Sequence, residues 1–173
     1  MMKLEKYTCT CCGQQHEDWP ALGYSSPVFY DELPPELKEK CELDSDFCVM
    51  SLDDQTDYFI RCTLTQKVND HCDDLEYGVW VSLSEASFTN YSDNYNNENH
   101  EARYFGWLSS NLQGYEDTLS IPTNVNTRTG GFRPEVVPHE DHDHPFVRDY
   151  FNGISKEEAE RRINAMIVGF GNR

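Results

Sequence analysis

Two stretches in the middle of the chain alternate between apolar and polar residues as half-buried β-strands do. Every second residue of 58–65 is apolar, and the same period recurs in residues 77–83, with Trp80 on the opposite face. An acidic link at residues 70–74 separates them, and it is short, as expected for neighbouring antiparallel strands. We therefore predict that the two strands pair and that Cys62 faces the core.

Shorter patterns extend this sheet. A strand is expected at residues 104–108. Residues 124–129 and 132–137 flank Gly130-Gly131, which suits a hairpin turn because both glycines accept positive φ. These segments therefore add strands on the C-terminal side of the first pair.

Three segments have helical periodicity. Short helices are predicted within residues 33–41 and 84–95. The clearest helix covers residues 155–169, where Ser155 as N-cap and Glu158 three residues later form a capping box. One apolar stripe should dock this helix on the sheet, and its members are Ala159, Ile163, Met166, Ile167 and Phe170.

The chain is strongly acidic. Lys and Arg total 14 against 31 Asp and Glu, which gives a formal net charge of −17. Such a field repels nucleic acid and anionic membranes, so we expect neither as a partner. A basic protein is the partner that this charge favours, although an acidic surface can also serve solubility alone.

Composition also bears on compartment and cysteine chemistry. The charged start of the chain leads into no apolar run of about 7 to 15 residues, and no stretch approaches the ~20 apolar residues of a membrane span. We therefore expect a cytoplasmic protein. Seven cysteines, an odd count in a reducing compartment, favour thiols and metal ligation over disulfides.

The N-terminal motif carries the most chemical information. Cys9 and Cys12 have the C-x-x-C spacing of a zinc knuckle, and His16 is within reach of the same ion. Tetrahedral zinc needs a fourth ligand, and we predict Cys48, because a turn there leads into a strand that can point back. Cys11 can replace either neighbouring cysteine. The other candidates for the fourth ligand are Cys41, Cys62, Cys72, His71, His100, His139, His142 and His144.

These features predict a single α+β domain over residues 1–173. It comprises an antiparallel sheet of about five or six strands in residues 46–137, the amphipathic C-terminal helix at 155–169, and residues 1–30 as a zinc-knuckle-like segment and loop packed on the sheet. Only 38% of residues are hydrophobic, but 13% are aromatic, and aromatic side chains bury a large area each. Structural Zn²⁺ would stabilise the loop-rich N-terminus.

Other interpretations stay open. The cysteines are alternatively reduced and buried, or Cys9 and Cys12 form a thiol-redox pair. His139, His142 and His144, interleaved with carboxylates, could hold the ion of a small metal-dependent hydrolase, or the loop is solvated, with His144 at most a single ligand. The chain lacks the usual hydrolase and phosphate-loop signatures, so we assign no catalytic residue.

Several motifs together resemble those of one known family. They are Cys9-x-x-Cys12-Gly13-x-x-His16, Asp46-Phe47-Cys48, Tyr58-Phe59-Ile60-Arg61, Gly78-Val79-Trp80-Val81-Ser82-Leu83-Ser84, Tyr104-Phe105-Gly106-Trp107-Leu108 and His144-Pro145-Phe146. In order and spacing the chain resembles the bacterial domain of unknown function 2199 family. The resemblance implies a small bacterial domain and carries no activity, since the family is uncharacterised.

The function that these observations favour is a non-catalytic zinc-binding interaction module with an acidic surface. An immunity or antitoxin-like inhibitor that captures a basic toxin is one form of it.

Overall fold

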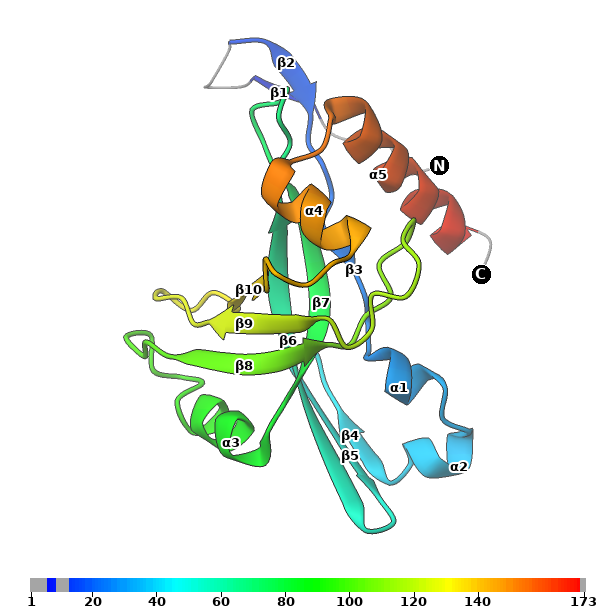
Figure 1. Ribbon diagram of the computed structural model, residues 1–173, viewed down its shortest axis with the longest axis vertical. Helices are drawn as coiled ribbons and strands as arrows, with labels where there is room; N and C mark the ends of the chain where they lie inside the picture. The colour runs from blue at the N-terminus through cyan, green and yellow to red at the C-terminus, as the bar shows by residue number, and fades with distance from the viewer. Residues whose placement is uncertain (1–5, 9–12, 172–173) are drawn as a thin grey trace.

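A meander of five strands closes into a barrel at the centre of the molecule (Figure 1). The computed structural model describes residues 6–8 and 13–171. Each barrel strand pairs antiparallel with the next one along the chain. Because the number of strands is odd, the first and last run in the same direction, and the closing pair is parallel, with Glu135 opposite Thr63. The strands are β6 (Gln55–Gln66), β7 (Leu75–Leu83), β8 (Arg103–Leu108), β9 (Pro122–Asn126) and β10 (Glu135–Pro138).

This architecture corrects the expected antiparallel sheet. Within the described part of the chain the main sheet has eight strands, in the order β3-β7-β8-β9-β10-β6-β5-β4, and β6 also pairs with β7. The pairs β10–β6 and β3–β7 are parallel. The hydrophobic period of a strand shows which of its faces is buried but not which strands it pairs with. The period therefore could not predict that the barrel closes. The strands outside the barrel are β3 (Leu22–Gly23), β4 (Cys41–Leu43) and β5 (Phe47–Leu52).

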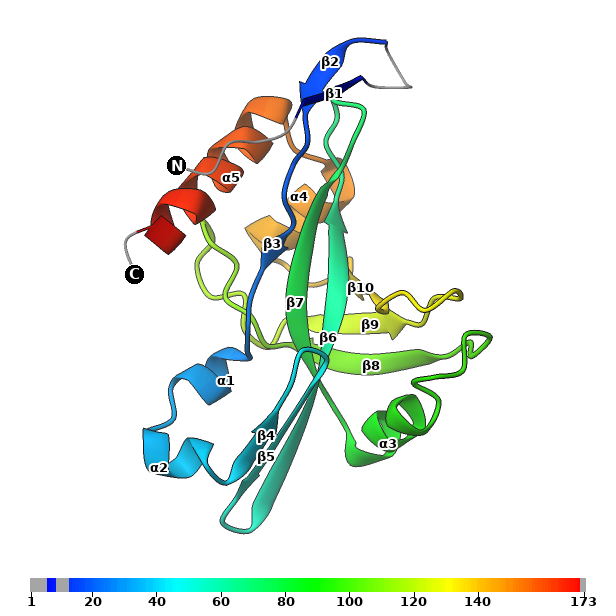
Figure 2. The ribbon, with the colours of Figure 1, turned by 180° about the vertical axis from the view of Figure 1, so that it is seen from behind.

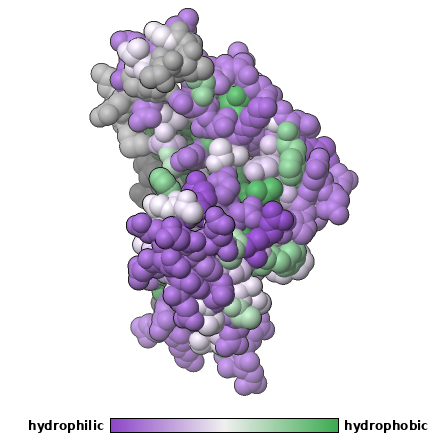
Figure 3. Space-filling model, turned by 90° about the vertical axis from the view of Figure 1, so that its left-hand side faces the viewer, coloured by the Kyte–Doolittle hydropathy of each residue, from purple (hydrophilic) through white to green (hydrophobic). Residues whose placement is uncertain are grey.

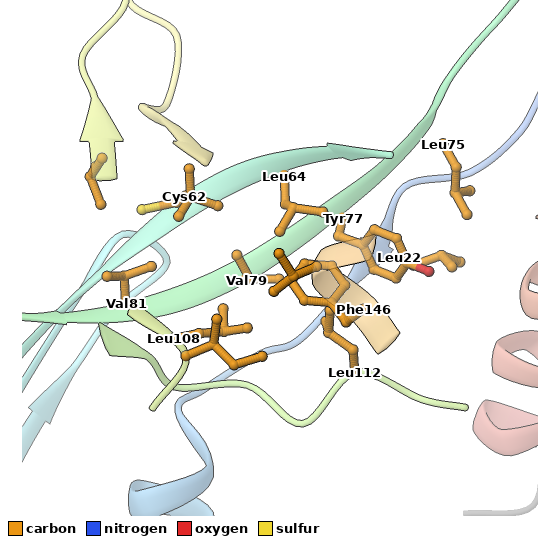
Figure 4. Close-up of a cluster of buried hydrophobic side chains, with 14 of the residues drawn as sticks. Leu22, Cys62, Leu64, Leu75, Tyr77, Val79, Val81, Leu108, Leu112 and Phe146 are labelled. Atoms are coloured by element: carbon orange, nitrogen blue, oxygen red, sulfur yellow. The ribbon is translucent and has the colours of Figure 1, made fainter. Parts of the chain in front are cut away.

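Alternate side chains of β6 and β7 fill the barrel. Cys62, Val79 and Val81 are fully buried, and Figure 4 shows them in one apolar cluster, so the prediction that Cys62 faces the core is confirmed. On β8, a Cβ added to Gly106 would lie 2.3 Å from Val81 Cγ1 and 2.9 Å from the Ser82 carbonyl oxygen. Glycine therefore permits the close approach of β8 to β7.

Two helices complete the barrel core. In Figures 1 and 2, α3 (Glu85–Asp93) lies below β8 and α4 (Pro145–Asn152) lies above β9. Tyr91 of α3 and Phe146 of α4 are buried in the same cluster as the barrel interior. The predicted helix after Ser84 is confirmed, since its hydroxyl caps α3 by accepting a 3.1 Å hydrogen bond from the Ser87 amide.

A second, smaller apolar cluster lies outside the barrel, on the other face of β6 and β7. Its buried members are Cys48, Met50, Phe59 and Trp80. The Trp80 indole donates to the Tyr24 carbonyl oxygen at 2.8 Å, which ties the N-terminal segment to β7. The elements beside this cluster include α1 (Val28–Asp31) and α2 (Pro35–Lys38).

The helix predicted within residues 33–41 is shorter than expected. Only Pro35–Lys38 is helical, and Cys41 begins β4, where it lies opposite Met50. Pairing with β5 therefore outweighs the local helical periodicity of this segment.

The C-terminal helix α5 (Lys156–Gly171) confirms the capping box at its start. The Ser155 hydroxyl accepts a 3.1 Å hydrogen bond from the Glu158 amide, and Ala159 and Ile163 are buried. The helix continues to Gly171, so the predicted end at residue 169 is two residues early. Among the described residues, no helix combines the length and apolar character needed to cross a bilayer.

Arg162 joins α5 to the barrel through buried polar contacts. Its side chain is 6% exposed, and the guanidinium donates to the Glu158 carboxylate at 2.9 Å, the Tyr77 hydroxyl at 3.2 Å and the Tyr115 hydroxyl. Tyr115 in turn donates to Asp149 at 2.6 Å. A charge this deeply buried is stable only when it is paired and hydrogen-bonded, so these contacts fix where the helix docks.

Replacing Arg162 should destabilise the fold. We expect Arg162→Ala to lower the free energy of unfolding by about 3 kcal/mol, because its buried partners lose their donor. Arg161→Ala is the matched control: Arg161 pairs with the same Glu158, but its side chain is 60% exposed. Arg161→Ala should lower the free energy of unfolding by less than about 1 kcal/mol, measured by urea unfolding followed by circular dichroism. Equal losses would contradict the structural role of Arg162.

Glu158 should make stability depend on pH. Hydrogen bonds from Arg161 and then from Arg162 lower the pKa of its carboxyl to about 2, from an ordinary value of 4.5. Its contribution to stability is therefore complete above the ordinary pKa and is lost as the pH falls through the folded-state pKa. We expect Glu158→Gln to be less stable than the wild type near neutral pH, with the difference shrinking between pH 4.5 and 2. Thermal unfolding across this range, with the exposed Glu157→Gln as control, measures it.

Candidate functional site

His16 of the predicted zinc motif lies in an N-terminal hairpin. Strands β1 (Lys6–Thr8) and β2 (Gln15–Glu17) pair antiparallel, with His16 opposite Tyr7. Gly13 has a φ of +71°, a left-handed value that favours glycine where the chain turns back into β2. Cys9, Cys11 and Cys12 lie outside the described residues.

The hairpin lies beside the loop that joins β6 to β7. Figures 1 and 2 both show these segments together at one end of the molecule. Just after β2, the Trp19 ring contacts the His71 ring, with 4.2 Å between centroids and 49° between ring planes. Cys72 follows in the same loop and is partly buried. The fold therefore places a histidine and a cysteine, residue types that can bind metals, beside the hairpin.

Cys48, the predicted fourth ligand, lies elsewhere. It is fully buried in β5, opposite Phe59, and Figure 1 shows β5 in the lower half of the molecule, with the hairpin at the top. Burial raises the pKa of its thiol to about 12, and Cys41 and Asp31 add to this rise. Zinc binds the thiolate, so this neutral, desolvated thiol is poorly suited as a ligand. The structure does not bring Cys48 to the hairpin.

His144 has a capping role. It is the N-cap of α4, where Nδ1 accepts a 3.0 Å hydrogen bond from the Phe146 amide. Nε2 lies 2.7 Å from the Glu116 carbonyl oxygen, so this nitrogen donates. Both ring nitrogens are thus engaged within the protein, and neither lone pair is directed at a metal.

The other two histidines of this loop do not join His144 in a site. Nε2 of His139 is 3.3 Å from Asn124 Oδ1, and its ring packs against Phe105. The His142 amide donates to the His139 carbonyl oxygen in a turn. Over residues 6–8 and 13–171, no group of three or more His, Cys, Asp or Glu side chains could hold a metal ion. The hydrolase interpretation gains no support from this geometry.

A groove of about 630 Å³ lies on the outside of the barrel. Half of the described residues that line it are apolar, three of them aromatic, and Asp57 is the single charged residue among them. Much of the face in Figure 3, by contrast, is hydrophilic. The groove is lined by Phe29, Leu33, Met50, Gln55, Asp57, Phe59, Ser82, Trp107, Ser109 and Ser120.

Strand β8 presents aromatic residues to solvent beside this groove. Trp107 is 46% exposed and Phe105 is 47% exposed, and their rings meet edge to face at 4.9 Å. Gly106, between these two residues, faces the barrel, and so do Tyr104 and Leu108. The alternation in this segment predicts only a strand. Aromatic residues at outward positions of a half-buried strand were the signal that could have revealed the groove.

Comparison with known proteins identifies the family. Neither the curated proteins nor the solved structures contain a match to the chain. A family model described as an uncharacterised protein conserved in bacteria, DUF2199, matches residues 8–154. The match covers the N-terminal hairpin from Thr8, the whole barrel and α4, and it confirms the resemblance noted in the sequence. The chain therefore belongs to the DUF2199 family of uncharacterised bacterial proteins.

Proposed function

We propose that this protein is a non-catalytic, zinc-stabilised interaction module whose external groove binds a basic, partly apolar segment of another protein. The groove is the observation that carries this proposal. It exposes Trp107 and Phe29, and large aromatic side chains are the residues that contribute most to protein–protein interfaces. An immunity or antitoxin-like inhibitor of a basic protein is one form that such a module takes.

Charge favours a basic occupant. Asp57 lies in the groove wall, and the exposed Asp31 of α1 and Asp53 and Asp54 of the β5–β6 turn lie on elements that build its walls. No Lys or Arg side chain is among the described residues that line the groove. A chain of net charge −17 would attract a cationic partner at long range, while the apolar floor would provide the contact area.

The zinc part of the proposal rests on the N-terminal motif. Cys9, Cys12 and His16 are the proposed ligands, and structural zinc supplies folding free energy of order 10 kcal/mol in favourable cases. The described strands of this hairpin have only three residues each, and a two-stranded hairpin of this size is not stable alone. A metal ion at this position would compensate for the small area that the hairpin can bury.

Groove binding can be tested with two synthetic peptides. The two peptides have the same length and the same apolar residues. At the polar positions one peptide carries Lys and the other carries Glu. We expect calorimetry to show that the Lys peptide binds, that the Glu peptide does not, and that salt weakens binding. Trp107→Ala or Asp57→Lys should weaken it by at least about tenfold.

The matched control is Phe132→Ala. Phe132 is 67% exposed, more than Trp107, but it does not line the groove. Its replacement should leave the affinity unchanged. Failure of the Lys peptide to bind, or equal losses in the groove and control variants, would refute the proposed groove function.

Metal analysis tests the zinc part separately. We expect about one zinc ion for each chain, and the same content in His142→Ala, because the proposed site is at the N-terminal hairpin. Loss of the metal in the His142→Ala variant would instead support the metal-dependent hydrolase. A chelator should lower the melting temperature of the wild type.

A further inference from the structure

We propose that the Arg61 guanidinium, on the outer face of β6, binds the carboxylate group of a ligand through its two terminal nitrogens. This site is separate from the external groove and from the proposed zinc binding. It lies where β6, β7 and β3 run side by side, as Figure 2 shows.

Arg61 is an exception among the arginines of the described residues. Its guanidinium makes no hydrogen bond or ion pair with any of these residues, and its Nε is buried without an acceptor. Each of the other arginines in this part of the chain donates to a side-chain or carbonyl oxygen. Nη1 and Nη2 of Arg61 also lack an acceptor there, but unlike Nε they keep contact with solvent. A carboxylate can therefore reach these two nitrogens and accept a hydrogen bond from each.

Two glycines make room for this guanidinium. Gly78 of β7 and Gly23 of β3 are paired in register, and neither has the left-handed φ that would itself require glycine. A Cβ added to Gly23 would lie 2.9 Å from Arg61 Nη2, and one added to Gly78 would lie 3.0 Å from the same nitrogen. Glycine weakens a strand, so the fold gives up stability at two adjacent positions to hold a charge without a partner. Such a cost is typical of a functional site.

The charge of Arg61 is poorly compensated by its surroundings. Asp46 attracts it, but this carboxylate already accepts hydrogen bonds from Arg133 Nε at 2.7 Å and from the Tyr95 hydroxyl at 2.8 Å. Burial, and then the charge of Arg133, lower the pKa of the Arg61 guanidinium, while Asp46 opposes them. Arginine stays protonated at any physiological pH, so a positive charge remains available to an anion.

The geometry and the nearby charges favour a carboxylate. The guanidinium carbon of Arg61 lies 5.8 Å from the centre of the Trp80 ring, and this contact orients the planar group. Two nitrogens of a guanidinium match the two oxygens of a carboxylate. A pocket of about 440 Å³ is lined by Thr63, the next outward residue of β6. Glu76 and Asp46 also line it, and they would repel a doubly charged phosphate more strongly than a carboxylate.

NMR titration of the ¹⁵N-labelled full chain tests the site. The probes are acetate and a short peptide with uncharged side chains and a free C-terminus, each at an ionic strength matched with NaCl. We expect the Gly78 and Gly23 amide signals to shift and saturate with at least one probe, with a Kd of about 10 mM or tighter. Saturation by acetate indicates a small acid as the ligand, whereas saturation by the peptide alone, and not by its amidated form, indicates a polypeptide C-terminus.

Three variants test the role of the guanidinium, and dispersed spectra show that each is folded. Arg61→Lys keeps the charge but loses the planar pair of donors, so it should weaken binding by at least about tenfold. Gly23→Ala should weaken it as well, because the added Cβ would displace Nη2. Arg103→Lys is the matched control, since the exposed Arg103 of β8 already donates to Asn126 at 3.0 Å, and it should leave the affinity unchanged.

Three results would overturn the proposal. They are the absence of saturable shifts with both probes, tighter binding of inorganic phosphate than of either carboxylate, and equal losses of affinity in Arg61→Lys and Arg103→Lys.

Discussion

The parallel pairing of β10 with β6 is the constraint on which the rest of the structure depends. It is short, with Glu135 opposite Thr63 and the Thr63 amide donating to the Pro134 carbonyl oxygen at 2.9 Å. Yet it turns an open meander into a barrel, removes two strand edges, and gives β6 and β7 an inner and an outer face. The inner face holds the main core, and the outer face supports the second cluster and the groove.

Much of the local structure could be predicted from the sequence. The alternation in β6 and β7, the Ser84 cap of α3 and the Ser155–Glu158 capping box are short-range signals, and the structure confirms them. The closing pair joins segments about seventy residues apart and has no local signature. Arg162 was missed for a similar reason, because its partners Tyr77 and Tyr115 come from distant parts of the chain.

The candidate sites, too, are visible in the sequence only in part. The C-x-x-C spacing and His16 are visible in the sequence, but which loop lies beside the hairpin is not, and only the fold shows the contact between Trp19 and His71. The groove combines Phe29 of α1, Phe59 of β6 and Trp107 of β8, which are separated by tens of residues. No sequence motif marks this lining, because each of these aromatic residues looks ordinary within its own segment.

The three tryptophans are distributed so that each reports on a different region. Trp80 is fully enclosed in the second cluster, Trp107 is half exposed at the groove, and Trp19 lies against His71 at the hairpin. Their emission should therefore differ in wavelength and in quenching by small solutes. Variants that retain one indole at a time would give separate optical signals for the core, the binding surface and the proposed metal site, without any added label.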